Sequence, residues 1–121
     1  MTKRLLIVDD ALIMRKRIKE IAEQAGWEIA GEAADGEEAV ALYKSERPDL
    51  VTLDIVMPKM DGVTALKHVM ATDSAARVVM ISAVDQRAKL IECLAHGAVD
   101  FIVKPFDAAR LRKFFDKYLV A

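Results

Sequence analysis

The chain has 121 residues, a formal net charge of −1 and a hydrophobic fraction of 54%. A chain of this length usually forms one domain with a core of its own, so we interpret residues 1–121 as a single domain. Its 18 basic and 19 acidic residues nearly cancel, which argues against the strong positive field that non-specific nucleic-acid binding requires. The single cysteine, Cys93, excludes an internal disulfide and suits a reducing compartment.

No apolar run in the sequence approaches the roughly 20 residues of a transmembrane helix. The first apolar run ends at Asp9, which makes it too short for the core of a signal peptide. We therefore expect a cytoplasmic protein that does not insert into a membrane.

Strand-like and helix-like segments alternate along the chain. Residues 5–8 form a fully apolar run, which is typical of a strand buried on both faces. Apolar residues in the next segment follow helical spacing up to Gly26, a common helix stop. The expected strands are residues 5–8, 27–33, 50–53, 78–81 and 101–103. The expected helices are residues 14–25, the segment between Asp35 and Pro48, and residues 63–70, 88–95 and 111–119.

This alternation predicts an α/β fold with a five-stranded parallel sheet and helices on both faces. Ligands of such sheets bind outside the carboxyl ends of the strands. Four of the five expected strands end in polar or charged groups: Asp9 and Asp10 after the first, Asp54 after the third, Ser82 after the fourth and Lys104 after the fifth. We therefore expect these side chains to meet at one edge of the sheet.

Three carboxylates at one edge would repel one another, so the pKa of at least one should rise, or the cluster should capture a cation. Oxygen ligands favour a hard ion, Mg²⁺, for which Mn²⁺ can substitute. Lys104 and Ser82 could bind phosphate oxygens, and a carboxylate beside them could attack phosphorus. Each residue alone has a simpler interpretation, such as a helix cap or a solvated loop, but the set together predicts a phosphoryl-transfer site.

Four motifs carry a resemblance to a known family. The string LLIVDD (residues 5–10) resembles the opening of bacterial response-regulator receiver domains, and LDIVMPKMDG (residues 53–62) resembles their phosphoacceptor loop. MISA (residues 80–83) and DFIVKPF (residues 100–106) resemble their last two motifs. The resemblance covers the whole chain and implies a flavodoxin-like (βα)5 fold with strand order 2-1-3-4-5. That order is taken from the resemblance and not from the residue pattern.

The resemblance also implies roles for individual residues at the metal and acceptor positions. Asp54 would be the phosphoacceptor. Asp10 and Asp54 would ligate magnesium directly, Asp9 would act through a water molecule, and the backbone carbonyl of Val56 would supply a further ligand.

The remaining implied roles concern the phosphoryl group and the switch. Ser82 and Lys104 would bind phosphoryl oxygens, Phe101 would change rotamer when Ser82 moves, and the Lys104–Pro105 peptide would be cis. Val56 and Val84 stand where this family often carries polar side chains, which bears on the lifetime of the phosphorylated state.

The resemblance implies a sensor histidine kinase or a phosphotransfer protein as phosphodonor. The chain ends one helix after the Lys104 motif, so we expect no output domain and no direct DNA binding. It is most similar to the single-domain chemotaxis type, which controls a downstream protein. The alternative is an intermediate or a phosphate sink in a multistep phosphorelay. The protein would be a signalling switch that catalyses only its own phosphorylation and dephosphorylation.

A partner surface is expected on the face formed by the fourth helix, the fifth strand and the fifth helix. The fourth helix has one apolar stripe with Ile91 and a second with Leu90 and Leu94, about 100° around the axis. We interpret Leu90, Leu94 and Phe101 as the exposed partner surface; the alternative is one wide stripe buried in the core.

Three rival functions share parts of this pattern. A flavodoxin-like redox protein would need a Ser/Thr/Gly-rich loop after the first strand to bind phosphate, but here that loop is acidic. A phosphatase with an aspartyl nucleophile usually has a cap domain and a longer chain. A degenerate receiver that only binds partners would not need the complete acceptor set.

Overall fold

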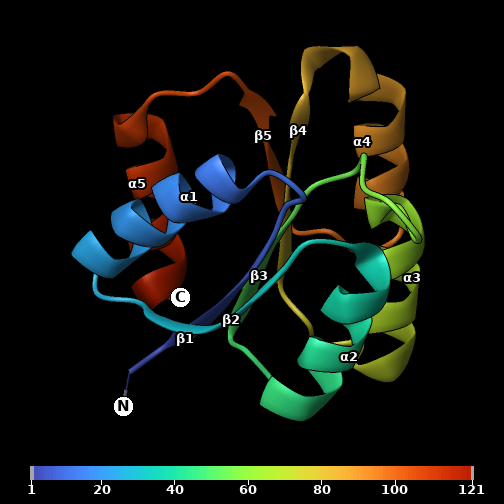
Figure 1. Ribbon diagram of the computed structural model, residues 1–121, viewed down its shortest axis with the longest axis horizontal. Helices are drawn as coiled ribbons and strands as arrows, with labels where there is room; N and C mark the ends of the chain where they lie inside the picture. The colour runs from blue at the N-terminus through green and yellow to red at the C-terminus, as the bar shows by residue number, and fades with distance from the viewer. Residues whose placement is uncertain (1, 121) are drawn as a thin grey trace.

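A five-stranded parallel sheet with the strand order β2-β1-β3-β4-β5 forms the middle layer of the molecule (Figure 1). The structure, a computed structural model, describes residues 2–120. The strands are β1 (Arg4–Val8), β2 (Glu28–Ala33), β3 (Leu50–Leu53), β4 (Val78–Ala83) and β5 (Asp100–Lys104). The helices are α1 (Leu12–Gln24), α2 (Gly36–Glu46), α3 (Gly62–Thr72), α4 (Arg87–Ala95) and α5 (Ala108–Val120), with a short 3-10 turn at Val84–Gln86 before α4.

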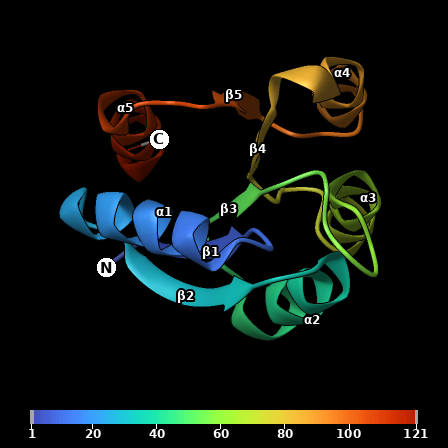
Figure 2. The ribbon, with the colours of Figure 1, turned by 45° about the horizontal axis from the view of Figure 1, so that its top comes forward.

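The predicted fold class and the strand order 2-1-3-4-5 are both confirmed. Helices α1 and α5 cover one face of the sheet, and α2, α3 and α4 cover the other (Figures 1 and 2). Each face has its own hydrophobic core, because the strands alternate their side chains between the two layers. Within residues 2–120, no helix is both long and apolar enough to cross a membrane.

The strands differ from their predicted bounds at two points that matter for the site. Strand β4 continues to Ala83 and β5 to Lys104, so Ser82 and Lys104 lie in the last residues of strands and not in the loops beyond them. Strand β2 begins at Glu28 and not at Trp27. Trp27 is buried, and its indole N–H donates to the carbonyl of Phe115 at 3.0 Å. Trp27 therefore ties the α1–β2 connection to α5.

The start of α3 lies directly against the end of β3. The N–H of Gly62 donates to the carbonyl of Ile55 at 2.7 Å, and a Cβ atom at residue 62 would overlap with the carbonyl of Asp54. The Asp61 carboxylate caps α3 by accepting from the N–H of Thr64 at 2.8 Å. Together these contacts close the loop of residues 55–61, called the acceptor loop below, onto the helix that follows it.

Candidate functional site

The three predicted carboxylates lie together at the carboxyl ends of β1 and β3. These two strands are neighbours, with Val8 opposite Leu53, so the residues that follow them are brought to the same edge. One carboxylate oxygen from each of Asp9, Asp10 and Asp54 lies within 4.8 Å of the others. Asp9 and Asp54 are buried, whereas Asp10 is exposed to solvent. The predicted grouping of these acids is confirmed.

Lys104 reaches the carboxylates from β5, across the intervening strand β4. Its Nζ lies 2.8 Å from Oδ2 of Asp9 and 3.4 Å from Oδ2 of Asp54. Burial lowers the pKa of Lys104, but the hydrogen bond that Lys104 donates to Asp9 and the charges of Asp54 and Asp9 outweigh it, so the pKa is raised. Lys104 therefore remains protonated and supplies one positive charge to three carboxylates. The peptide that follows, Lys104–Pro105, is cis, as the resemblance implied.

Burial raises the pKa of Asp54 above its ordinary value. The charge of Asp9 adds to this increase, whereas Lys104 and the N–H of Ile55, which donates to Oδ1 of Asp54 at 2.8 Å, oppose it. One lysine does not compensate two buried carboxylates. The site thus has a deficit of positive charge that a bound cation would relieve.

A hard divalent cation fits this donor set. The ligands are all oxygen atoms, and the exposed Asp10 lets a cation keep part of its water shell, as Mg²⁺ prefers. The oxygens of Asp9 are already engaged: Oδ1 accepts from the N–H of Ala11 at 2.9 Å and Oδ2 accepts from Lys104. Asp54 also accepts at both oxygens, from the N–H of Ile55 at 2.8 Å and from Lys104 at a longer 3.4 Å, so the exposed Asp10 is the carboxylate most open to a cation and Asp54 is held less closely than Asp9.

Ser82 is 1% exposed, and its hydroxyl has no hydrogen-bond partner within residues 2–120. Ser82 and Lys104 lie on the adjacent strands β4 and β5, with Ala83 opposite Lys104 in the register. A buried hydroxyl without a partner costs free energy, so a ligand oxygen that reached Ser82 would satisfy a group that the protein leaves unsatisfied.

Arg15 is a residue near the site that the sequence did not single out. Its guanidinium donates to the carbonyl of Asp9 at 2.7 Å and to Oε1 of Glu32 at 3.2 Å. It therefore fixes the backbone at the end of β1, next to the carboxylates. Arg15 follows Asp9 by six residues, on a helix, and no motif in the sequence marks that contact.

The exposed face of α4 is not the one expected from the sequence. Leu90 is 2% exposed and packs into the core with Cys93, whereas Ile91 is 62% exposed. The expectation that Leu90 is exposed is therefore wrong. Leu90 and Cys93 are the buried residues of α4 and mark the side of the helix that faces the core. Leu94 is 39% exposed.

Phe101 lies beside α4 and is half-buried. It lines an apolar cavity of about 260 Å³ together with Val84, Arg87, Leu90, Ile91 and Val103. Leu90 thus contributes to the wall of a cavity and not to the outer surface of the helix. The cavity lies between α4 and β5, and Val103 in its wall is opposite Ser82 on the neighbouring strand.

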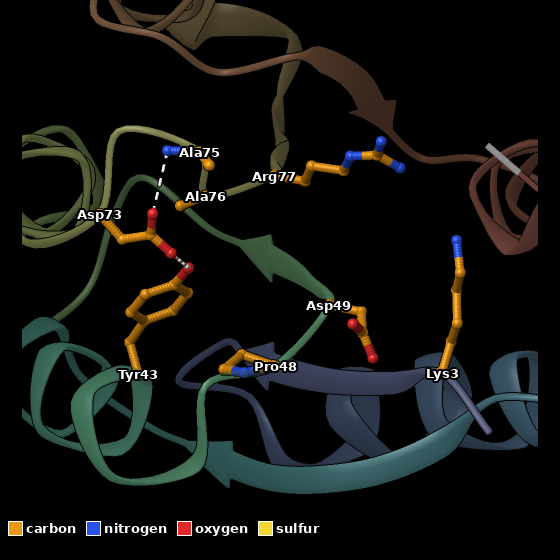
Figure 3. Close-up of a pocket in the computed structure, with 8 residues that line it drawn as sticks. All are labelled: Lys3, Tyr43, Pro48, Asp49, Asp73, Ala75, Ala76 and Arg77. Carbon is orange, nitrogen blue, oxygen red and sulfur yellow. Dashed lines mark hydrogen bonds between the residues drawn. The ribbon is translucent and has the colours of Figure 1, made fainter. Parts of the chain in front are cut away.

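A second cavity, of about 280 Å³, lies at the opposite edge of the sheet, near the amino-terminal ends of β1, β3 and β4 (Figure 3). Its acids are engaged by protein groups. The Asp73 carboxylate accepts from the Tyr43 hydroxyl at 2.8 Å and from the N–H of Ala75 at 3.0 Å, and Asp49 accepts from the N–H of Arg4 at 2.8 Å. We assign this cavity no ligand, and the acidic cluster at the carboxyl edge is the candidate site.

The raised pKa of Asp54 predicts a pH-dependent effect of Asp54→Asn on stability when no divalent cation is present. Between the ordinary value of 3.8 and the higher folded value, the folded protein holds the Asp54 proton more tightly than the unfolded chain does. The folded state therefore loses stability as pH rises through this window. Asparagine does not titrate and does not lose this stability. The free energy of unfolding of Asp54→Asn should therefore increase relative to that of the wild type as pH rises from about 3.5 to 7.

Urea denaturation in EDTA at a series of pH values checks this prediction. Asp85→Asn is the control, because it removes a carboxylate that is exposed and not buried. A stability difference between Asp54→Asn and the wild type that stays constant over the whole pH range contradicts it.

Known proteins resemble this chain in sequence and in fold. The family model that describes the response regulator receiver domain matches residues 5–116 of this chain. The chemotaxis protein CheY of Thermotoga maritima is 50% identical over 117 residues, which are 97% of this chain and 98% of that protein. CheY of Bacillus subtilis is 50% identical over 119 residues, covering 98% of this chain and 99% of that protein.

Solved structures of receiver domains also resemble this chain in fold. A chain in the CheX–CheY–BeF3–Mg complex from Borrelia burgdorferi matches with a TM-score of 0.88 and 47% identity, over 92% of this chain and 84% of that chain. The response regulator domain of Thermotoga maritima CheB matches with a TM-score of 0.88 and 35% identity, over 100% and 98% of the two chains. The chain belongs to the response regulator receiver domain family.

Proposed function

We propose that this protein is a phosphorylation-controlled switch in chemotaxis signalling, in which residues 1–121 act as one receiver domain. The observation that carries the proposal is the group of three carboxylates at adjacent strand ends, with Lys104 bonded to two of them. The near full-length likeness to CheY proteins supports the chemotaxis assignment. No observation favours the alternative of a phosphorelay intermediate or phosphate sink.

In this proposal Asp10 and Asp54 bind Mg²⁺ directly, with Mn²⁺ as a possible substitute. Asp9 acts through a water molecule, because Lys104 holds it more closely than it holds Asp54, at 2.8 Å against 3.4 Å, and the backbone carbonyl of Val56 is a further ligand. When bound, the ion neutralises charge on the transferring phosphoryl group.

The acceptor is Asp54. Its carboxylate oxygen forms a bond to the phosphorus of a phosphohistidine, on a sensor histidine kinase or a phosphotransfer protein, as the phosphorus–nitrogen bond breaks. The electron pair of that bond stays with the histidine. The proposal places this step in the cytoplasm, where the ATP that phosphorylates the histidine is found. The protein thus acts as a switch that takes part in its own phosphorylation, and not as an enzyme for other substrates.

Ser82 and Lys104 then bind the phosphoryl oxygens. Among the described residues the Ser82 hydroxyl has no partner, so it breaks no hydrogen bond with them when it binds, and Lys104 can leave Asp9 for the phosphoryl group. Movement of Ser82 lets Phe101 turn inward beside the cavity next to α4. A downstream protein reads this change on the face of α4, β5 and α5, where Leu94, Ile91 and Phe101 offer apolar surface and Leu90 supports it from below.

The assignment of the acceptor predicts a single phosphoryl group on Asp54. With Mg²⁺ and acetyl phosphate, the wild type should gain one acid-stable, base-labile phosphoryl group, whereas Asp54→Asn should gain none, because its amide is a poor nucleophile. Intact-mass spectrometry measures the gain, and EDTA should abolish it. Equal labelling of Asp54→Asn at the same pH would sink the assignment.

The surroundings of the acceptor predict a long-lived phosphorylated state. Hydrolysis needs a water molecule held in line with the phosphorus–oxygen bond, and a polar side chain can orient that water. Val56 and Val84 are 57% and 72% exposed and cannot form hydrogen bonds through their side chains. The double change Val56→Asn with Val84→Glu should therefore speed phosphate release about tenfold, equivalent to ~1.4 kcal/mol of barrier.

Single-turnover release of phosphate from the labelled protein measures this rate. The change Val99→Asn, at an exposed valine before β5, is the control for a polar substitution away from the site. A double variant that decays at the wild-type rate means that water is positioned by other groups.

A further inference from the structure

The acceptor loop contains a strained turn. The N–H of Met60 donates to the carbonyl of Pro58 at 2.7 Å, which closes a three-residue turn with Lys59 at its centre. Lys59 has a φ of 67°, in a region that residues other than glycine rarely adopt. Tight turns of this kind are rare and strained, and such a backbone persists only where surrounding groups hold it.

The groups that hold this turn come from the start of α2. The N–H of Gly36 donates to the carbonyl of Met60 at 3.0 Å, as the loop passes beside the start of α2 (Figure 2). The Asp35 carboxylate caps α2 by accepting from the N–H of Glu38 at 2.8 Å and lies 3.7 Å from Nζ of Lys59. The Lys59 side chain is largely exposed, so this ion pair is weak, and the Gly36 hydrogen bond is the stronger restraint.

Residue 36 has no room for a side chain. A Cβ atom there would overlap with the carbonyl oxygen of Met60, the same atom that accepts the hydrogen bond. Both contacts involve backbone atoms, so no rotamer change could relieve the overlap. Any larger residue at position 36 must push the acceptor loop away from α2.

We propose that Gly36 is a positioning residue for the metal site: by holding the Met60 carbonyl it fixes the acceptor loop and, through the loop, the backbone at Val56. This inference rests on the proposed function, in which the Val56 carbonyl and Asp54 bind magnesium. The loop is held at two points, by Gly62 at Ile55 and by Gly36 at Met60, and Val56 lies between them. Loss of the second point lets the proposed carbonyl ligand move.

The test compares the Mg²⁺ affinities of the wild type, Gly36→Ala and Gly97→Ala by isothermal titration calorimetry with magnesium chloride. Outer groups that orient metal ligands typically change affinity 10- to 100-fold, so Gly36→Ala should bind Mg²⁺ at least about tenfold more weakly. Gly97→Ala is the matched control. Gly97 has a φ of 106°, and a Cβ there would lie 2.8 Å from Cε of Met70, so this variant is also strained, but it precedes β5 at the opposite end of the sheet.

Gly97→Ala should keep its Mg²⁺ affinity within about twofold of the wild type, although circular dichroism should show both variants to be folded but less heat-stable. Wild-type affinity in folded Gly36→Ala overturns the inference. An equal loss of affinity in both variants also overturns it, because the effect would then follow stability alone.

A measurement on the wild type covers the case in which Gly36→Ala does not fold. The amide resonance of Gly36 should shift during a titration with magnesium chloride, with the same dissociation constant as the resonances of Asp54 and Val56, whereas that of Gly97 should not. A Gly36 resonance that stays in place while those of Asp54 and Val56 shift overturns the inference. If the wild type binds no magnesium at all, the proposed function fails, and this inference with it.

Discussion

The repulsion among three carboxylates at one sheet edge is the constraint on which the rest of the site depends. Lys104 offsets part of it, from 2.8 Å at Asp9 and 3.4 Å at Asp54. At ~4 Å and an effective dielectric near 20, one such charge pair amounts to ~4 kcal/mol before the cost of desolvation. Burial nevertheless raises the pKa of Asp54. The folded protein thus has a deficit of positive charge at this site, and binding of a divalent cation would relieve it.

The fold supplies this arrangement through strand order. Because β1 lies between β2 and β3, the acids that follow β1 and β3 are adjacent, whereas Lys104 and Ser82 arrive from β5 and β4 on the other side. The Ser82 hydroxyl, unpartnered within residues 2–120, belongs to β4, and Val103, opposite Ser82 on β5, lines the apolar cavity beside Phe101. A phosphoryl group on Asp54 would add negative charge that a bound cation and Lys104 offset, and its oxygens would give the Ser82 hydroxyl a hydrogen-bond partner next to the α4 face. Charge compensation and surface change are linked through neighbouring strands.

The residue pattern predicted the parallel sheet and the residues at its carboxyl edge, because fully apolar runs that end in acids are typical of buried parallel strands, whereas the strand order came only from the resemblance to receiver domains. Sequence reasoning was wrong about Leu90. The two apolar stripes of α4 are about 100° apart, and the side of the helix that faces the core follows neither of them: it takes Leu90 and Cys93 and leaves Leu94 39% exposed. Sequence reasoning also missed Arg15 and the hydrogen bond from Gly36 to Met60, since both join a residue to a backbone carbonyl elsewhere in the chain. Such contacts leave no periodic trace in a single sequence.

The affinity of Lys104→Met for magnesium is the most direct test of the charge-deficit account. If Lys104 and the ion compete to neutralise the same carboxylates, removing the lysine should tighten Mg²⁺ binding about tenfold at pH 7, equivalent to ~1.4 kcal/mol. Calorimetry of the folded variant measures it, and Lys67→Met, at an exposed lysine of α3 paired with Glu92, controls for the loss of a positive charge elsewhere. Unchanged or weaker binding in Lys104→Met would contradict the account, because Lys104 would then be organising the metal site and not competing for it.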